Sequence, residues 1–159
     1  MLAWSFEKLT DKPDNVTIET FDLDAIRSIL PHRDPMLLIQ GAEKHSSELG
    51  TEARAFYQVR GDEYFLQGHF PGNPVVPGVI LCEMMGQAAC VLVADQAGSK
   101  TPYFTGMDRV KFKQKVLPGD RIEIRSVLEK AKAPFFFIKS DLYVQGKLCA
   151  TAQLSFALI

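Results

Sequence analysis

The chain has 159 residues, of which 47% are hydrophobic, so it can bury one substantial core but is too short for two ordinary domains. Its 18 lysines and arginines nearly balance its 19 acidic residues, which excludes the overall basic excess that attracts nucleic acid or an anionic membrane. Three cysteines, without a Cys-x-x-Cys pair or a zinc-type spacing, predict free thiols and no bound metal. The N-terminal stretch resembles no secretory signal, so we expect a cytoplasmic protein.

Residues 1–21 are mixed and polar, without a periodic apolar face. We therefore expect an N-terminal extension, followed by a single domain at residues 22–159. Asp22 is placed to cap a short helix that ends at Pro31. Two extended segments are expected next, at residues 36–39 and 52–58.

A rigid loop and a buried helix are predicted in the middle of the chain. The loop, residues 68–78, contains three glycines and three prolines, which exclude a regular helix or a central strand. Residues 79–97 have few helix breakers and are apolar on nearly all sides, as expected for a helix surrounded by protein. Glu83, a proline, a glycine and a glutamine interrupt the apolar run at 75–94, so we do not expect it to cross a membrane.

The last third of the chain predicts strands. Residues 109–113 alternate basic and apolar side chains, a pattern that predicts a strand with Val110 and Phe112 on its buried face. Pro118-Gly119 suits the centre of a type II turn. Further strands are expected at residues 121–128, 134–144 and 147–158. Two strands, one long buried helix and four more strands indicate an α+β fold in which a sheet wraps the helix.

His69 is the only histidine inside the rigid loop. The ordinary pKa of an imidazole lies near neutrality, which suits a residue that accepts or donates protons in a reaction. The alternative is a structural hydrogen bond within the loop.

Glu83 is the only acidic residue of the predicted buried helix before its last turn, and it follows the start of that helix at Gly78 by about a turn and a half. A buried carboxylate is costly unless it is paired, hydrogen-bonded or protonated. It can act as an acid beside a neutral imidazole, or it can bond a loop N–H or Gln87 in a structural role. The helix start at Gly78 offers unpaired N–H groups, which suit a carbonyl oxygen that gains negative charge.

A close family resemblance is carried by residues 68–89, GHFPGNPVVPGVILCEMMGQAA. This segment resembles the signature of the (3R)-hydroxyacyl-acyl-carrier-protein dehydratases of bacterial fatty-acid synthesis, the FabZ type. The match combines HFPG, PxxPG before the helix, and an acidic residue fourteen positions after the histidine (83 − 69 = 14). Residues 30–35, LPHRDP, and residues 106–120, which end in PGD, resemble two further family segments. Glutamate at position 83 favours the FabZ type over the related dehydratase-isomerase, which typically has aspartate.

The resemblance implies a hotdog fold, in which an antiparallel sheet wraps a long central helix. It also implies a homodimer, in some members assembled further into a trimer of dimers, with His69 facing Glu83 of the partner subunit. Acyl carrier protein is the implied partner, and no cofactor is expected beyond its pantetheine arm.

The implied reaction removes water from a β-hydroxyacyl thioester. His69 is expected to take the α-proton, Glu83 to protonate the departing hydroxyl and the Gly78 N–H to hold the thioester carbonyl. The side chains expected to contact substrate are Phe70, Val79, Gln87 and Met107, for which core packing is the alternative. A dehydratase-isomerase and an acyl-thioesterase of the same fold remain alternatives. A non-catalytic acyl-thioester sensor that regulates transcription lacks sequence room for a DNA-binding module.

The basic side chains Arg109, Lys111, Lys113 and Lys115 form a predicted docking patch for the acidic carrier protein. A solvated strand face is the alternative.

Overall fold

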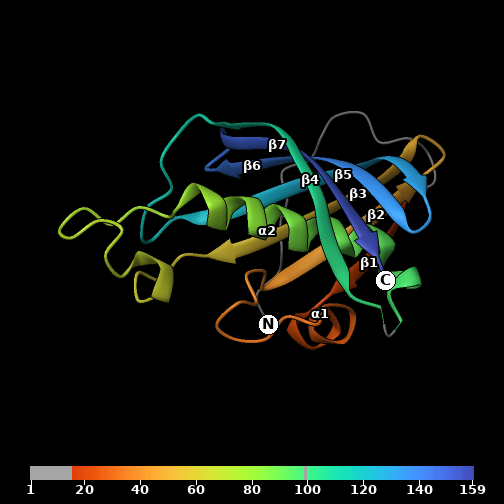
Figure 1. Ribbon diagram of the computed structural model, residues 1–159, viewed down its shortest axis with the longest axis horizontal. Coiled ribbons are helices and arrows are strands. Elements are labelled where there is room, and N and C mark those ends of the chain that lie inside the picture. The colour runs from red at the N-terminus through yellow and green to blue at the C-terminus, as the bar shows by residue number, and fades with distance from the viewer. Residues whose placement is uncertain (1–15, 99) are drawn as a thin grey trace.

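An antiparallel sheet of seven strands is the framework of the described chain, residues 16–98 and 100–159, in the computed structural model (Figure 1). The strands are β1 (Thr17–Phe21), β2 (Gly41–Ser47), β3 (Gly50–Gln58), β4 (Pro102–Phe112), β5 (Arg121–Lys132), β6 (Phe135–Val144) and β7 (Lys147–Leu158). They lie in the order β1-β2-β3-β5-β6-β7-β4, so β1 and β4 are the edge strands.

The helices of the described chain are α1 (Leu23–Ile29), η1 (Tyr64–Leu66), α2 (Gly78–Cys90), η2 (Val91–Val93) and α3 (Ala94–Ala97). The last three follow one another without a break and together occupy the predicted helical segment. Asp22 caps α1 as expected, because its carboxylate accepts the Ala25 N–H at 2.9 Å.

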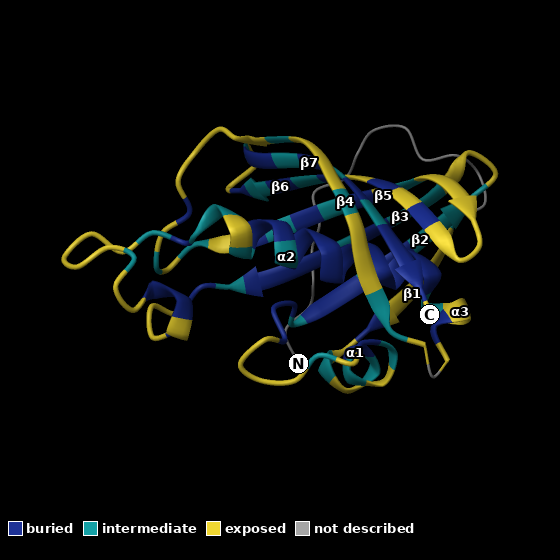
Figure 2. Ribbon diagram, in the orientation of Figure 1, coloured by how far each residue is buried: buried dark blue, intermediate teal, exposed yellow. Residues whose placement is uncertain are grey.

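Helix α2 is the centre of the core, and the sheet wraps around it (Figure 2). Met84, Met85, Ala88 and Ala89 have no exposed surface, because the inner face of β3, β5 and β6 covers them. The predicted α+β architecture, with a sheet around one long helix, is confirmed. Residues Gly78–Ala97 are apolar and long enough to cross a membrane by length and composition alone, but 61% of their most apolar window is buried inside the protein.

Two N-terminal elements differ from the expectation. Thr17–Phe21, part of the expected extension, pairs along its whole length with β2, whereas residues 1–15 lie outside the described chain. In β1 only Phe21 is buried, because this edge strand is otherwise exposed to solvent. Its sequence therefore lacks the apolar alternation that predicts a strand. The expected strand at residues 36–39 is wrong, and the strand lies instead at Gly41–Ser47. That strand turns Lys44 inward, where it pairs with Asp95 of α3 at 2.6 Å and disguises the apolar pattern.

Strand β4 is irregular where the sequence predicts clean alternation. Its register with β7 shifts between Asp108 and Lys111, and Arg109 adopts a left-handed backbone with φ 51°. The strand ends at Phe112, which is 53% exposed, so the predicted burial is wrong for this residue, whereas Val110 packs against the core. An edge strand with a bulge is covered on one side only, which removes the simple two-residue period.

The predicted turn at Pro118-Gly119 is confirmed. Gly119 has φ 91°, and the Asp120 N–H donates to the Leu117 carbonyl at 3.1 Å, as a type II turn requires.

Candidate active site

His69 lies in the loop between η1 and α2, and this loop extends beyond the end of the sheet (Figure 1). Its Nδ1 lies 2.9 Å from the Val75 carbonyl oxygen. A carbonyl oxygen only accepts, so Nδ1 must carry the proton, and in the neutral ring Nε2 is left as a free base. The loop holds this arrangement through backbone bonds, since the Val75 N–H donates to the His69 carbonyl and the Val76 N–H to that of Val116.

Helix α2 begins next to this histidine. Pro77 precedes the first helical residue, and its carbonyl accepts the N–H groups of Ile80 and Leu81. Within the described chain no acceptor takes the N–H groups of Gly78 and Val79, so both remain available at the positive end of the helix dipole. Gly78 lets the Phe112 ring lie close to the helix start, because a Cβ at position 78 would lie 2.7 Å from Cζ of Phe112 and would displace this ring.

An open hollow of about 550 Å³ joins the histidine to the helix start. Its lining comprises His69, residues 75–79, Leu81 and residues 112–116. Five predicted site residues therefore share one hollow: His69, Gly78 and Val79, with Lys113 and Lys115 from the predicted basic patch. Val79, on the first turn of α2, is 75% exposed.

Glu83 lies in the second turn of α2 and lines a different, smaller hollow of about 150 Å³. The Nε2 atom of His32 lies 3.2 Å from its Oε1, and the Gln87 amide donates to the same oxygen at 2.9 Å. These contacts lower the pKa of Glu83 below its ordinary value, the bond from His32 contributing most, although burial acts in the opposite direction. The sequence contained His32 within the LPHR segment but carried no signal of a chemical role, because 51 residues separate it from Glu83.

Gln87 is 1% exposed and joins the helix to the chain that follows α1. Its Oε1 accepts the Leu38 N–H at 2.8 Å, and its Nε2 donates to the Met36 carbonyl at 2.7 Å as well as to Glu83. Both donor hydrogens of the amide are thereby used. The side chain was expected to contact substrate, but its amide is engaged within the chain and positions Glu83.

The remaining predicted residues lie outside both linings. Phe70 is exposed and stacks on the His69 ring, with centroids 4.1 Å apart, and Met107 is exposed on β4. Arg109 and Lys111 are exposed near the β4 bulge, apart from Lys113 and Lys115 in the hollow. The row of basic side chains on one strand face is therefore wrong in its geometry, because the strand is bulged and ends before Lys113.

One chain does not bring His69 and Glu83 into contact, since they line separate hollows. Strand β4 lies along the same side of α2: the Phe112 ring covers Gly78, and the Phe104 ring covers Gly86 so closely that a Cβ there would clash. Strand β4 is largely exposed (Figure 2), and its exposed apolar residues are Tyr103, Phe104, Met107 and Phe112. Val79 on the first turn of α2 and Phe70 in the loop before it are exposed as well.

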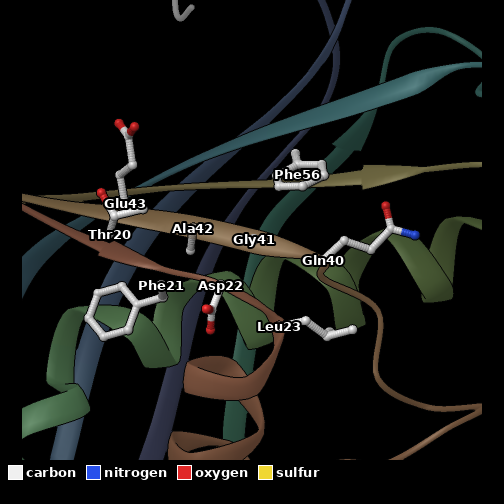
Figure 3. Close-up of a pocket in the computed structure, with 9 residues that line it drawn as sticks. All are labelled: Thr20, Phe21, Asp22, Leu23, Gln40, Gly41, Ala42, Glu43 and Phe56. Carbon is white, nitrogen blue, oxygen red and sulfur yellow. The ribbon is translucent and has the colours of Figure 1, made fainter. Parts of the chain in front are cut away.

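A third hollow of about 140 Å³ lies between β1, β2 and the start of α1 (Figure 3). Three of its polar side chains have partners in the chain: Asp22 caps α1, Gln40 accepts the Gln58 N–H and Glu43 bonds His45. It contains none of the predicted site residues. In residues 16–98 and 100–159 no three metal-binding side chains gather as a candidate metal site.

Solved structures of the hotdog fold are similar to this one. The dehydratase heterocomplex ApeI:P of Xenorhabdus doucetiae matches with a TM-score of 0.70 at 19% identity, over 84% of this chain and 90% of that chain. The PaaI protein of the E. coli phenylacetic acid degradation operon matches with a TM-score of 0.55 at 14% identity, over 73% of this chain and 82% of that chain. The expected hotdog fold is confirmed.

The fold and the family matches together place the chain among the dehydratases of the hotdog class. The family model ApeI-like, described as ApeI dehydratase, matches residues 43–152. The 3-hydroxyacyl-[acyl-carrier-protein] dehydratase FabZ of Caldicellulosiruptor saccharolyticus is 40% identical over 87% of this chain and 99% of its own length. The FabZ dehydratase of Streptococcus thermophilus is 38% identical over 87% of this chain and 98% of its own length. The chain belongs to the FabZ family of 3-hydroxyacyl-[acyl-carrier-protein] dehydratases, as its resemblance predicted.

Gln87→Leu should destabilise the fold by about 2–4 kcal/mol, because the Leu38 N–H and the Met36 carbonyl lose their partner in a buried place. Urea unfolding followed by circular dichroism measures this change. Gln153→Leu on β7 is the matched control, since no hydrogen bond of its side chain is seen in the described chain, and it should change the free energy of unfolding by less than about 1 kcal/mol. Equal effects of the two variants would contradict the role given to Gln87.

Proposed function

We propose that this protein converts (3R)-hydroxyacyl-acyl carrier protein to trans-2-enoyl-acyl carrier protein in fatty-acid biosynthesis, the activity that the names of its relatives imply. The observation that carries the proposal is the fixed tautomer of His69. Its Nδ1–H is held by the Val75 carbonyl, and its Nε2 is a free base in the hollow that contains the helix start.

The proposed base and the carbonyl site act on adjacent atoms of the substrate. His69 Nε2 takes the α-proton, and the negative charge that develops on the thioester oxygen is stabilised by the free N–H groups of Gly78 and Val79. Because these donors are fixed by the helix, they need no reorganisation during the reaction. Val79 at the rim of the hollow is placed to contact the first methylenes of the acyl chain.

Glu83 is the proposed acid. We propose that Glu83 of one chain and His69 of a second copy of this chain together form one active site. Two features support a homodimer: the two side chains line separate hollows of one chain, and the edge strand β4 exposes large apolar side chains that water would otherwise cover. A trimer of dimers is the further assembly that the family resemblance implies.

Acyl carrier protein is the proposed carrier of the substrate. Lys113 and Lys115 line the His69 hollow and are exposed, so they can meet the negative charge of the carrier and of its phosphopantetheine arm at the point where the arm enters. Arg109 and Lys111 extend this basic surface toward the bulge of β4. We place the enzyme in the cytoplasm, where such carriers are soluble partners.

His69→Ala and Glu83→Gln should each lower the hydration of a crotonyl thioester by about a thousandfold, because each variant lacks one proton-transfer group. His45→Ala on β2, outside both hollows, is the matched control and should retain activity. Product analysis by NMR separates trans-2-enoyl product from an isomerised double bond, and a free-thiol assay detects a thioesterase. Near wild-type turnover in either active-site variant, or thiol release without dehydration, would contradict the proposal.

An equimolar mixture of His69→Ala and Glu83→Gln chains, unfolded and refolded together, should regain about a quarter of the wild-type activity. Random pairing makes about half of the dimers mixed, and one of the two sites in each mixed dimer has both groups intact. Each variant refolded alone is the control. If the mixture is no more active than its components, the two groups act within one chain.

Lys113→Glu/Lys115→Glu should raise KM for carrier-bound substrate by about tenfold or more and weaken its dependence on salt. Lys130→Glu/Lys132→Glu on β5 changes the net charge equally and serves as the control. The measurement compares carrier-bound substrate with a small pantetheine thioester, for which the increase should be smaller. Equal KM increases in both double variants would exclude a local docking surface.

A further inference from the structure

His32 lies in the segment after α1 and approaches Glu83 from across the small hollow. Its Nε2 is 3.2 Å from Glu83 Oε1, and the two side chains are 23% and 22% exposed, so water screens this pair only partly. The guanidinium of Arg33 holds the segment by donating to the carbonyls of Leu30 and His32 at 2.8 and 2.7 Å. These two hydrogen bonds fix the backbone at His32, and thereby help to hold its side chain next to the Glu83 carboxyl.

The rest of the imidazole ring has no polar partner. Its Nδ1 is the one buried side-chain nitrogen or oxygen in the described chain without a hydrogen bond. A histidine kept for structure would be expected to satisfy both nitrogens when buried. Every polar contact of this ring goes instead to Glu83.

The other titratable groups near Glu83 are neutral at pH 7. Tyr64 of η1 has a pKa raised by burial and by the charge of Glu83, and burial together with that charge raises the pKa of Cys90, on α2 itself, to about 12. Tyr103 of β4 lines the same hollow. Among the described residues around this carboxyl, His32 is the side chain that can take up a further proton and become cationic.

This geometry conflicts with a lone Glu83 acting as the acid. The bonds from His32 and Gln87 favour the carboxylate, and a carboxylate has no proton to give. The same contact that ionises the carboxyl brings a second proton-binding group to it. The proton missing from Glu83 can reside on His32, one hydrogen bond away.

We propose that His32 and Glu83 share a single proton, and that His32 acts as a positioning residue that supplies this proton to the departing hydroxyl through Glu83. The inference rests on the proposed dehydration. As the C–O bond breaks, Glu83 delivers a proton to the hydroxyl, which leaves as water, while His32 Nε2 passes its proton to Glu83 Oε1. His69 has taken the α-proton, so the electrons of the C–H bond form the double bond. His69 then releases a proton to solvent and His32 takes one up, which leaves no net change.

Two variants at position 32 separate proton supply from simple support. In His32→Gln the side-chain amide can still donate to Glu83 but cannot ionise, whereas His32→Ala removes both properties. The measurements are kcat, KM and the pH dependence of kcat for dehydration of a (3R)-hydroxybutyryl thioester, the direction in which the shared proton is consumed. His45→Gln is the matched control, at a histidine that pairs with Glu43 instead.

Both position-32 variants should lower kcat at pH 7.5 by about tenfold or more, with KM changed by less than about threefold. The alkaline limb of the pH profile should move to lower pH by about one unit or more. Without the imidazole, Glu83 itself must hold the proton, and the bond from Gln87 favours its carboxylate form, so the proton is lost at lower pH. A His32→Gln enzyme with wild-type kcat and an unmoved alkaline limb would overturn the proposal.

A readout without turnover uses the native enzyme and Glu83→Gln, both labelled with ¹⁵N-histidine. The midpoint of the His32 titration should lie about one pH unit or more lower in Glu83→Gln, because the carboxylate that stabilises the imidazolium is gone. An unmoved midpoint overturns the shared proton even if the position-32 variants fail to fold. If the wild type does not dehydrate the substrate but the His32 midpoint still differs between the two proteins, the shared proton stands and the proposed function is wrong.

Discussion

The burial of α2 inside the sheet is the constraint on which the rest of the structure depends. A helix covered on nearly all sides must be apolar, and any polar group on it loses water and must find a partner in the protein. Glu83 and Gln87 lie one turn apart on this helix, and Gln87 resolves the problem for three groups at once by bonding Glu83, Leu38 and Met36. The carboxyl is thus oriented by the same contacts that attach the segment after α1 to the core.

The open side of α2 explains why the site lies there. Gly78 and Gly86 allow the aromatic rings of β4 to reach the helix backbone, so this edge strand covers only part of the helix and leaves hollows at His69 and at Glu83. The two hollows and the apolar surface beside them belong to one side of the molecule. The proposed acyl chain and the proposed second copy of the protein would both need apolar surface, and this side offers it to both.

Some elements could be predicted and others could not, for identifiable reasons. The loop before α2 was predictable because its glycines and prolines restrict the backbone locally, and α2 was predictable because its apolar residues continue around all sides. Strand β2 was not, because Lys44 faces inward and is neutralised by Asp95, 51 residues away in sequence. The bulge of β4 was not, because nothing local distinguishes Arg109 from its neighbours in a regular strand.

The sequence by itself determined the central helix, the rigid loop and the α+β class. Through the spacing of His69 and Glu83 within one short segment, it also indicated the family. These features are local, since they depend on backbone restriction and side-chain periodicity over fewer than about 25 residues. The tertiary structure alone decided the tautomer of His69, the separation of the two hollows and the contact of His32 with Glu83. Each of these depends on a hydrogen bond or packing contact between groups that meet only when the chain folds. Composition and local spacing do not predict such contacts.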